Sequence, residues 1–280
     1  MTTVYKDTII KSLQDLGIKQ GDTVIVHSSF KSMGFVDGGA ETVISAFLDV
    51  IGEEGTLVFP TLVQKDFENA YKTWHMDKPS DVGYLTEYFR KREGSLRSDQ
   101  ATHSVAACGK YAAYLTETHG HTHKRFGDMG DTPFSADSPW QKMYEMDAKT
   151  VLLGVDERKI TFRHLAEYMY IEECLDSISH IPEKRQEMED GLEHFCHQPG
   201  AWPHVYAVRV FNEMKKEGIV IPQTTCGDAT VTAISSKFLV DYIMNMFRSG
   251  NREAIGGPEA GAKFIEWENE LKRIKNENKL

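Results

Sequence analysis

A histidine and a glutamate stand three residues apart in the segment 161–167, which reads Thr-Phe-Arg-His-Leu-Ala-Glu. On a helix His164 and Glu167 would share one face, because residues three apart are neighbours there. A carboxylate beside an imidazole orients the ring and stabilises its protonated form, which is what a general base requires. Amphipathic helices also carry such pairs as purely structural contacts. The spacing therefore predicts either a catalytic base or a satisfied polar pair.

A loop rich in hydroxyl groups runs from His27 to Gly34, directly after a short apolar run. Hydroxyls, a lysine and exposed backbone N–H groups at such a turn can hold a phosphate. The glycine spacing and the Gly-Lys-Ser/Thr ending of a Walker loop are missing. Serine-rich turns without a ligand are common, so phosphate binding and an ordinary turn both stay open.

Two further loops carry residues suited to anions. Arg97 and Ser98 precede the piece 102–105, and an arginine can clamp a phosphate or carboxylate through two hydrogen bonds, or simply form a surface ion pair. Ser138 and Pro139 fit a helix N-terminus, with the serine as N-cap and the proline at the first helical position. A helix N-terminus also favours negative charge.

Three alternating histidines, His119, His121 and His123, are the most conspicuous local pattern. On an extended segment they would face one side and could bind a metal, as in a metal-dependent hydrolase. Gly120 and the basic pair 124–125 favour a solvated loop instead. The cysteines lack both a short metal-binding spacing and a local base, and we expect them to be reduced thiols without a nucleophilic role. They are Cys108, Cys174, Cys196 and Cys226.

The elements that would position these residues follow an α/β order. Strands are predicted at 22–27, 56–59, 105–109 and 150–155, and helices at 5–16, 39–51, 84–90, 112–119, 161–175 and 264–274. The order strand, helix, strand over the first sixty residues predicts a parallel pair with a crossover helix. Ligands of such sheets bind at the carboxyl ends of the strands, where the loops above begin. We expect one α/β domain with a mixed sheet and helices on both faces.

Composition sets wider limits. The chain has 280 residues, 40% of them hydrophobic, which excludes fibrous and disordered classes. Its 32 Lys and Arg against 42 Asp and Glu give a net charge of −10, which argues against a nucleic-acid partner bound through bulk charge. No apolar run approaches the ~18 residues of a membrane span, and the first residues lack a signal core. We therefore expect a cytoplasmic protein with no membrane partner.

Taken in order, these segments resemble the aminoglycoside 3-N-acetyltransferase family. The resemblance covers about residues 5 to 170, and residues 227–242 look like the family's closing segment. One such piece alone would be weak evidence for the resemblance, whereas the whole set in this order is specific to the family. The matching pieces are 21–29, 31–34, 55–61, 97–98, 102–105, 138–140, 152–154 and 161–167.

The resemblance implies a single acetyltransferase domain over residues 1–280. It would pass an acetyl group from acetyl-coenzyme A, its co-substrate, to an amine of an aminoglycoside or a similar small molecule, without a metal. His164 matches the family's catalytic histidine and Glu167 the acidic position of the same helix. The absence of a recognisable nucleophile favours direct transfer in a ternary complex. The protein would be a monomer or homodimer. The positions that would line the cofactor are His27, Ser28, Ser29, Lys31, Ser32, Gly34, Arg97, Ser98, Thr102, His103, Ser104, Ser138 and Pro139.

The sequence also departs from the family. Ala101 stands where the family commonly has proline, and Arg163 is an unusual charge beside the catalytic histidine. Residues 176–222 do not match, and we expect a helical or irregular insertion there on the acceptor side. Its acidic stretch, 183–193, is the candidate attractor for a cationic acceptor. The alternatives to an acetyltransferase are the metal-dependent hydrolase and a non-catalytic relative that binds coenzyme A or senses nucleotides.

Overall fold

The computed structural model of the chain describes residues 2–65, 70–119, 133–193, 200–255 and 261–277. A seven-stranded mixed sheet lies at its centre, with the strand order β5-β6-β4-β2-β7-β9-β8. The strands of this sheet are β2 (Thr23–Ser28), β4 (Thr56–Pro60), β5 (Leu96–Arg97), β6 (Val105–Gly109), β7 (Lys149–Leu153), β8 (Gln223–Cys226) and β9 (Ala229–Ser235). Two further short strands, β1 (Thr3–Val4) and β3 (Phe35–Val36), pair with each other in parallel.

The three central strands run parallel. β2 pairs with β4 in parallel, as the sequence predicts, and on its other side it pairs with β7, with His27 opposite Leu152. β6, β5, β9 and β8 complete the sheet in antiparallel pairings. The carboxyl ends of β2, β4 and β7 therefore meet at one edge of the sheet, and the loops that follow these strands begin there.

Side chains alternate along β2 and separate two hydrophobic cores. Val24 and Val26 belong to the core on one face, while Ile25 belongs to the core on the other. The first face is covered by α1 (Lys6–Asp15), α2 (Gly39–Ile51) and α4 (Tyr84–Arg90). The second is covered by α5 (Ala112–Thr116), α6 (Pro139–Glu145), α7 (Phe162–Ser177) and α10 (Ser236–Ser249). The prediction of an α/β fold with a mixed sheet and helices on both faces is confirmed.

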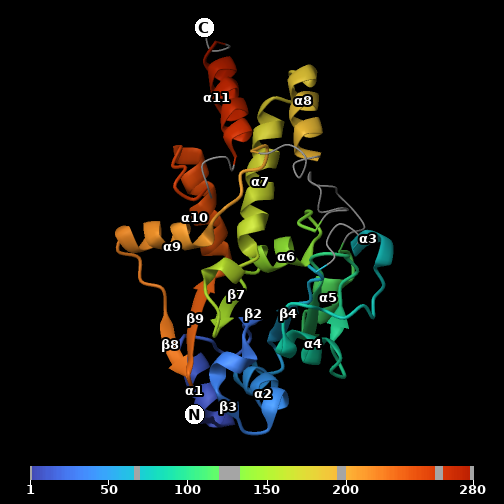
Figure 1. Ribbon diagram of the computed structural model, residues 1–280, viewed down its shortest axis with the longest axis vertical. Helices are drawn as coiled ribbons and strands as arrows, with labels where there is room; N and C mark the ends of the chain where they lie inside the picture. Colours follow the sequence, from blue (N-terminus) through green and yellow to red (C-terminus); the bar gives the residue numbers. More distant parts are fainter. Residues whose placement is uncertain (1, 66–69, 120–132, 194–199, 256–260, 278–280) are drawn as a thin grey trace.

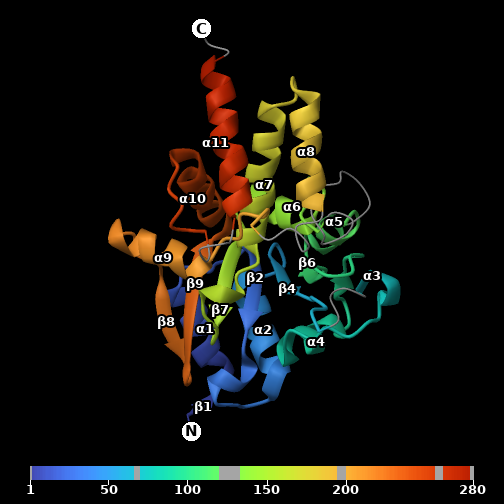
Figure 2. The same ribbon diagram turned by 45° about the horizontal axis from the view of Figure 1, so that its top comes forward.

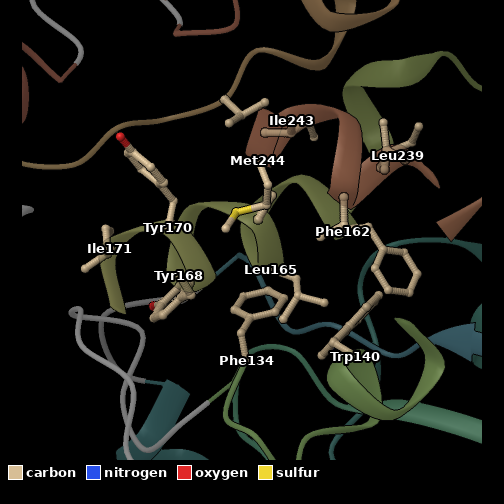
Figure 3. Packing of buried hydrophobic residues seen from close by; sticks show 14 of the residues in the cluster. Phe134, Trp140, Phe162, Leu165, Tyr168, Tyr170, Ile171, Leu239, Ile243 and Met244 are labelled. Atoms are coloured by element: carbon tan, nitrogen blue, oxygen red, sulfur yellow. The ribbon is translucent and has the colours of Figure 1, made fainter. Parts of the chain in front are cut away.

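The first residues of α7 pack into the second core. Figure 3 shows Phe162 and Leu165 of α7 facing Phe134 and Trp140. The Trp140 and Phe162 rings meet edge-on with their centroids 5.5 Å apart, and Phe134 lies 5.2 Å from Tyr168. All five side chains are buried. This aromatic packing fixes the start of α7, and with it the two residues that the sequence singles out for chemistry.

The rest of α7 extends away from the sheet beside two other helices. α8 (Pro182–Glu193) and α11 (Ala262–Glu277) lie with it at the end of the molecule opposite the N-terminus, as Figures 1 and 2 show. α9 (Ala207–Lys216) leads into β8. The remaining short elements are α3 (Ala70–Thr73) and the 3-10 turns η1 (Phe30–Met33) and η3 (Glu157–Lys159). None of the helices within the described ranges combines the length and the apolar character that a membrane crossing requires.

Candidate active site

His164 and Glu167 form a hydrogen-bonded pair on the first turns of α7. The distance from His164 Nδ1 to Glu167 Oε2 is 3.0 Å. The Glu167 side chain is fully buried, whereas that of His164 is 13% exposed. Because a carboxylate only accepts hydrogen bonds, Nδ1 carries the proton and Nε2 is left with its lone pair.

A distant segment completes the surroundings of Glu167. The Trp202 indole N–H donates to Oε2 at 2.8 Å, and the Val205 backbone N–H donates to Oε1 at 2.7 Å. Burial on its own raises the pKa of Glu167, but the charge attraction and hydrogen bond from His164 and the nearby charges of His204 and Arg163 bring that pKa below its ordinary value. The carboxylate is therefore ionised at neutral pH and holds the imidazole in one orientation.

His164 lines a cavity of about 600 Å³ at the carboxyl ends of the central strands. His27 and Ser28 from the end of β2, His103 from the loop before β6 and Arg163 line it as well. The His103 and His164 rings are 6.1 Å apart, nearly perpendicular. We call this space the inner cavity. It brings together residues that are far apart in the sequence, and four of them were assigned to one site by the sequence analysis: His27, Ser28, His103 and His164.

A second cavity of about 550 Å³ adjoins the first and opens near the hydroxyl-rich loop. The two share Ser28 and Lys159, and Ser29, Lys31 and Gly154 line only the second, which we call the outer cavity. Both lysines are exposed. The outer cavity is therefore suited to an anionic group, and the inner cavity presents imidazoles together with Lys159, Arg158 and Arg163.

Tight packing shapes the hydroxyl-rich loop. The Ser29 N–H donates to the Leu153 carbonyl at 2.8 Å, and the Ser32 hydroxyl donates to Ser29 Oγ at 2.7 Å. Gly154 follows β7 with φ of 68°, and a Cβ there would lie 2.8 Å from Cβ of Ser32. Only glycine fits this close approach, so the loop is held against the end of β7. Gly34, at φ of 85°, ends the turn.

Three buried polar atoms of the residues that line the inner cavity have no hydrogen-bond partner within the described part of the chain. They are His27 Nε2, Ser28 Oγ and Arg163 Nε. Burial lowers the pKa of His27 to about 4, so its imidazole is neutral at physiological pH. Since buried polar groups are nearly always paired in folded proteins, these atoms indicate a site that a ligand completes.

Several residues predicted to bind a cofactor lie outside both cavities. Arg97 donates to the carbonyl oxygens of Thr61 at 2.9 Å, Met76 at 2.8 Å and Lys78 at 2.5 Å, and its guanidinium stacks 4.6 Å from the Trp74 ring. Burial lowers the pKa of Arg97 to about 10. The structure therefore uses this arginine to join chain segments, and its donors are directed at the backbone.

The polar residues of the 98–105 loop are likewise engaged within the protein. The Ser104 hydroxyl lies 2.9 Å from Thr61 Oγ1, and Thr102 Oγ1 lies 2.9 Å from His103 Nδ1. Burial, followed by the charges of nearby groups, keeps the pKa of His103 well below its usual range. These contacts hold His103 in the cavity wall.

Ser138 and Pro139 form the helix N-terminus that the sequence predicts. The Gln141 N–H donates to Ser138 Oγ at 3.1 Å, and Pro139 is the first residue of α6. Neither residue lines the two cavities. Their effect on the site is indirect. They start α6, and α6 carries Trp140, whose indole donates to the His103 carbonyl at 3.0 Å.

The histidine cluster divides between described and undescribed parts of the chain. His119 is buried, with Nδ1 2.8 Å from Ser98 Oγ and Nε2 2.9 Å from the Pro133 carbonyl. Both ring nitrogens thus serve hydrogen bonds, and neither has a lone pair left for a metal. His121, His123 and Cys196 lie outside the described residues. Among those that are described, no group of three His, Cys, Asp or Glu side chains could hold a metal ion.

Lys159, Asp81 and Trp202 are among the residues of the site that were not identified from the sequence. Lys159 was within reach, because it follows the strongest predicted strand at the sheet edge where ligands bind. Asp81, which lines the inner cavity and accepts the N–H groups of Gln64 and Lys65, carries no local signal. Trp202 has none either, since its contact with Glu167 spans 35 residues.

Comparisons with known proteins identify the family of the chain. A family model described as aminoglycoside 3-N-acetyltransferase matches residues 25–248. The chain is 34% identical over 184 residues to an aminoglycoside N(3')-acetyltransferase-like protein, YokD, of Bacillus subtilis, covering 58% of this chain and 64% of that protein. It is 32% identical over 182 residues to aminoglycoside N(3)-acetyltransferase VII of Streptomyces paromomycinus, covering 59% and 60%. The matches thus span about three fifths of these relatives' length.

Solved structures share the fold over most of the chain. The apoenzyme of aminoglycoside acetyltransferase AAC(3)-IVa superposes with a TM-score of 0.69 at 21% identity, covering 97% of this chain and 99% of that one. AAC-IIIb in a binary complex with CoASH gives 0.67 at 17% identity, covering 92% and 99%. Sisomicin-bound AAC-VIa gives 0.66 at 18% identity, covering 89% and 99%.

Proposed function

Because the chain belongs to the aminoglycoside 3-N-acetyltransferase family, we propose that it transfers the acetyl group of acetyl-coenzyme A to an amine of an aminoglycoside or a similar amino compound. The observation that carries the proposal is the His164–Glu167 pair, with Nδ1 and Oε2 3.0 Å apart at the wall of the inner cavity. His164 is the general base and Glu167 holds its ring.

The two adjoining cavities suggest how the co-substrate binds. The phosphates of acetyl-coenzyme A occupy the outer cavity beside Lys31 and Lys159, and its thioester reaches the inner cavity past Ser28, which lines both. The unpartnered Ser28 Oγ and His27 Nε2 support a polar occupant. The similar AAC-IIIb structure contains CoASH. In this arrangement Arg97, Ser98, Thr102, Ser104, Ser138 and Pro139 position the walls.

The chemistry follows from the residue types. An alkylammonium group cannot attack a thioester until it loses a proton, so the acceptor enters as the free amine. Its nitrogen attacks the carbonyl carbon while His164 Nε2 takes a proton from it, and the carbonyl π pair moves to oxygen. When the C=O bond re-forms, the C–S bond breaks and the thiolate takes the proton back from His164. The products are the N-acetyl amine and coenzyme A.

Residues 176–222 are the proposed acceptor side of a single domain that spans residues 1–280. Within this stretch, Trp202 and the Val205 backbone bond directly to Glu167. The acidic stretch on α8 is a weaker attractor than its sequence suggests, because Glu187 pairs with Lys184 at 2.9 Å and Glu189 with Arg185 at 2.7 Å. The similar AAC-VIa structure binds sisomicin.

Release of free thiol from acetyl-coenzyme A in the presence of an amine panel tests the proposed activity. The panel contains aminoglycosides and simple amines that are not antibiotics. We expect amine-dependent thiol release, with the N-acetyl product identified by mass spectrometry. Coenzyme A binding without thiol release for any amine would instead favour a non-catalytic relative, and stoichiometric zinc in the purified protein would favour a hydrolase.

His164→Ala is expected to lower kcat by about 10²- to 10⁴-fold, because the proton then has no acceptor in the protein. Binding of coenzyme A, measured by calorimetry, should change less than about threefold. His180→Ala, at an exposed position, is the matched control and should retain full activity. Equal losses of turnover and binding in His164→Ala would give His164 a binding or structural role.

Direct transfer can be tested separately. A single turnover with radiolabelled acetyl-coenzyme A and no acceptor should leave the protein unlabelled after acid quenching. Stoichiometric label on the protein would establish an acetyl-enzyme and contradict the ternary complex.

A further inference from the structure

His27 is the last residue but one of β2, and its side chain lies on the same side of the sheet as α7. It alternates with Val26 and shares its face with Ile25, which belongs to the core that also contains Leu165. The side chain is only 5% exposed and lines the inner cavity together with His164. Of the two exposed lysines, Lys31 lines only the outer cavity, whereas Lys159 lines both cavities.

The Nε2 atom of His27 has no hydrogen-bond partner, although it is buried. Leaving such an atom unpaired is unfavourable, and in native structures it is explained by strain, by a functional role or by a bound water or ion. A bound molecule that reaches the inner cavity would supply the missing partner. The question is which group of that molecule meets His27.

The neutral charge of the His27 ring limits which group of acetyl-coenzyme A it can bind. Its pKa of about 4 makes the ring neutral, and a neutral ring is a poor substitute for a lysine beside a phosphate. The phosphates of the co-substrate have Lys31 and Lys159 in the outer cavity, whereas the reacting carbonyl must approach His164 in the inner one. A neutral donor also adds no positive charge beside a base that becomes cationic during the reaction.

We propose that His27 donates its Nε2–H to the thioester carbonyl oxygen of acetyl-coenzyme A and stabilises the oxyanion that forms there. This rests on the proposed acetyl transfer. As the amine nitrogen adds to the carbonyl carbon, the π pair moves to the oxygen and the hydrogen bond from His27 strengthens. When the pair returns and the C–S bond breaks, the proton on Nε2 has not moved. His27 thus acts as the hydrogen-bond donor to the oxyanion, and His164 acts as the base.

Three substitutions of His27 separate this role from binding and packing. Leucine removes the donor, asparagine places an amide near the Nδ1 position only, and glutamine places an amide N–H near the Nε2 position. Loss of one donor to an oxyanion lowers kcat by about 10²- to 10³-fold, which we expect for His27→Leu and His27→Asn. His27→Gln should recover to within about tenfold of the wild type.

Two measurements besides turnover accompany these rates. The Kd of coenzyme A, which lacks the acetyl carbonyl, should change less than about threefold in all three variants. The Tm of His27→Leu in the absence of ligand should equal or exceed that of the wild type, because the substitution removes a buried unpaired polar atom. His180→Asn, at the exposed position used above, should match the wild type in every measurement.

Several outcomes would overturn the inference. Turnover of His27→Leu and His27→Asn within twofold of the wild type would remove His27 from the chemistry while leaving the acetyl transfer intact. A loss of coenzyme A affinity as large as the loss of kcat would make His27 a binding residue. If His27→Leu does not fold, the asparagine and glutamine variants decide between the same outcomes. A wild-type protein that acetylates no amine would overturn both proposals.

Discussion

Glu167 connects the chemistry of α7 to a segment nearly forty residues later in the chain. Its two oxygens accept hydrogen bonds from His164, Trp202 and the Val205 backbone, so little of their capacity is left unused. Such a carboxylate fixes the tautomer and the direction of the imidazole. Two of these contacts, from Trp202 and the Val205 backbone, also hold the 202–205 segment against the helix.

Glu167→Gln should affect activity and stability together. A glutamine offers one acceptor oxygen in place of two, and its NH₂ group would face an N–H donor. We expect kcat to fall by about 10²-fold or more, because the orientation of His164 is lost. We also expect the free energy of unfolding to fall by about 1–3 kcal/mol, measured by urea denaturation.

Trp202→Phe is the control for Glu167→Gln. It removes one donor and leaves the His164–Glu167 bond in place, so stability should fall while kcat stays within about fivefold. An equal loss of kcat in both variants would mean that the packing around Glu167 matters for turnover and the orientation of His164 does not.

At the scale of elements, Arg97 ties together the loops around the site. Its guanidinium bonds to carbonyl groups of the 61–78 region, and β5, which ends at Arg97, pairs with β6. A lysine in this place cannot donate in three directions from one plane. Arg97 therefore has a structural role: it holds Met76 and Lys78 of the loop that follows β4 against the end of that strand.

Arg97→Lys distinguishes this bracing role from the phosphate clamp that the sequence resemblance implies. We expect the free energy of unfolding to fall by about 1–3 kcal/mol through unpaired carbonyl groups, with the Kd of coenzyme A changed less than about twofold. A tenfold weaker affinity at unchanged stability would support the clamp. Urea denaturation and calorimetry on the same sample give both values.

The elements that the sequence predicted are those with a strong hydrophobic pattern. The buried run of β2, the apolar run 57–59 that follows Gly55, and the His-x-x-Glu turn of α7 each depend on local spacing. α8 was not assigned, because its face carries ion pairs in place of apolar residues. The hairpin of β8 and β9 was also missed, although Gly227 and Asp228 between threonine-rich strands are a turn signal.

Site residues divide in a similar way. The sequence analysis assigned His27, His103 and His164, which all line the inner cavity. His27 ends a predicted strand and His164 starts a predicted helix, whereas His103 was assigned through the family resemblance. The sequence also assigned Arg97 to the ligand, since residue type alone does not distinguish a guanidinium directed at a cavity from one directed at carbonyl groups. The partners of Glu167 depend on long-range packing that no local pattern encodes.

For the whole molecule, buried histidines make stability depend on acidity. Burial lowers the pKa of His27 to about 4 and brings the pKa of His103 and His204 below the ordinary 6.5. Between these values the unfolded chain binds protons that the folded chain does not. Stability is therefore full above pH 6.5 and is lost as the pH falls towards 4.

Between pH 6.5 and pH 4, His27 alone lowers the free energy of unfolding by up to about 3 kcal/mol. Urea denaturation at pH 7, 6 and 5 should show a steady loss for the wild type and a shallower one for His27→Leu. Parallel curves for the two proteins would mean that His27 is not held neutral by the fold.

The oligomeric state, monomer or homodimer, and the cytoplasmic location stay predictions.

The parallel pairing of β2 with β7 has a consequence for synthesis of the protein. About 120 residues separate Ser28 from Lys149, yet the two strands lie side by side in the finished sheet. At a translation rate of about 5–20 residues per second, one edge of β2 waits on the order of ten seconds on the ribosome for its partner. An unpaired, apolar strand edge is a template for aggregation. The edge of β2 that later pairs with β7 is thus an aggregation-prone part of the nascent chain until β7 has been synthesised.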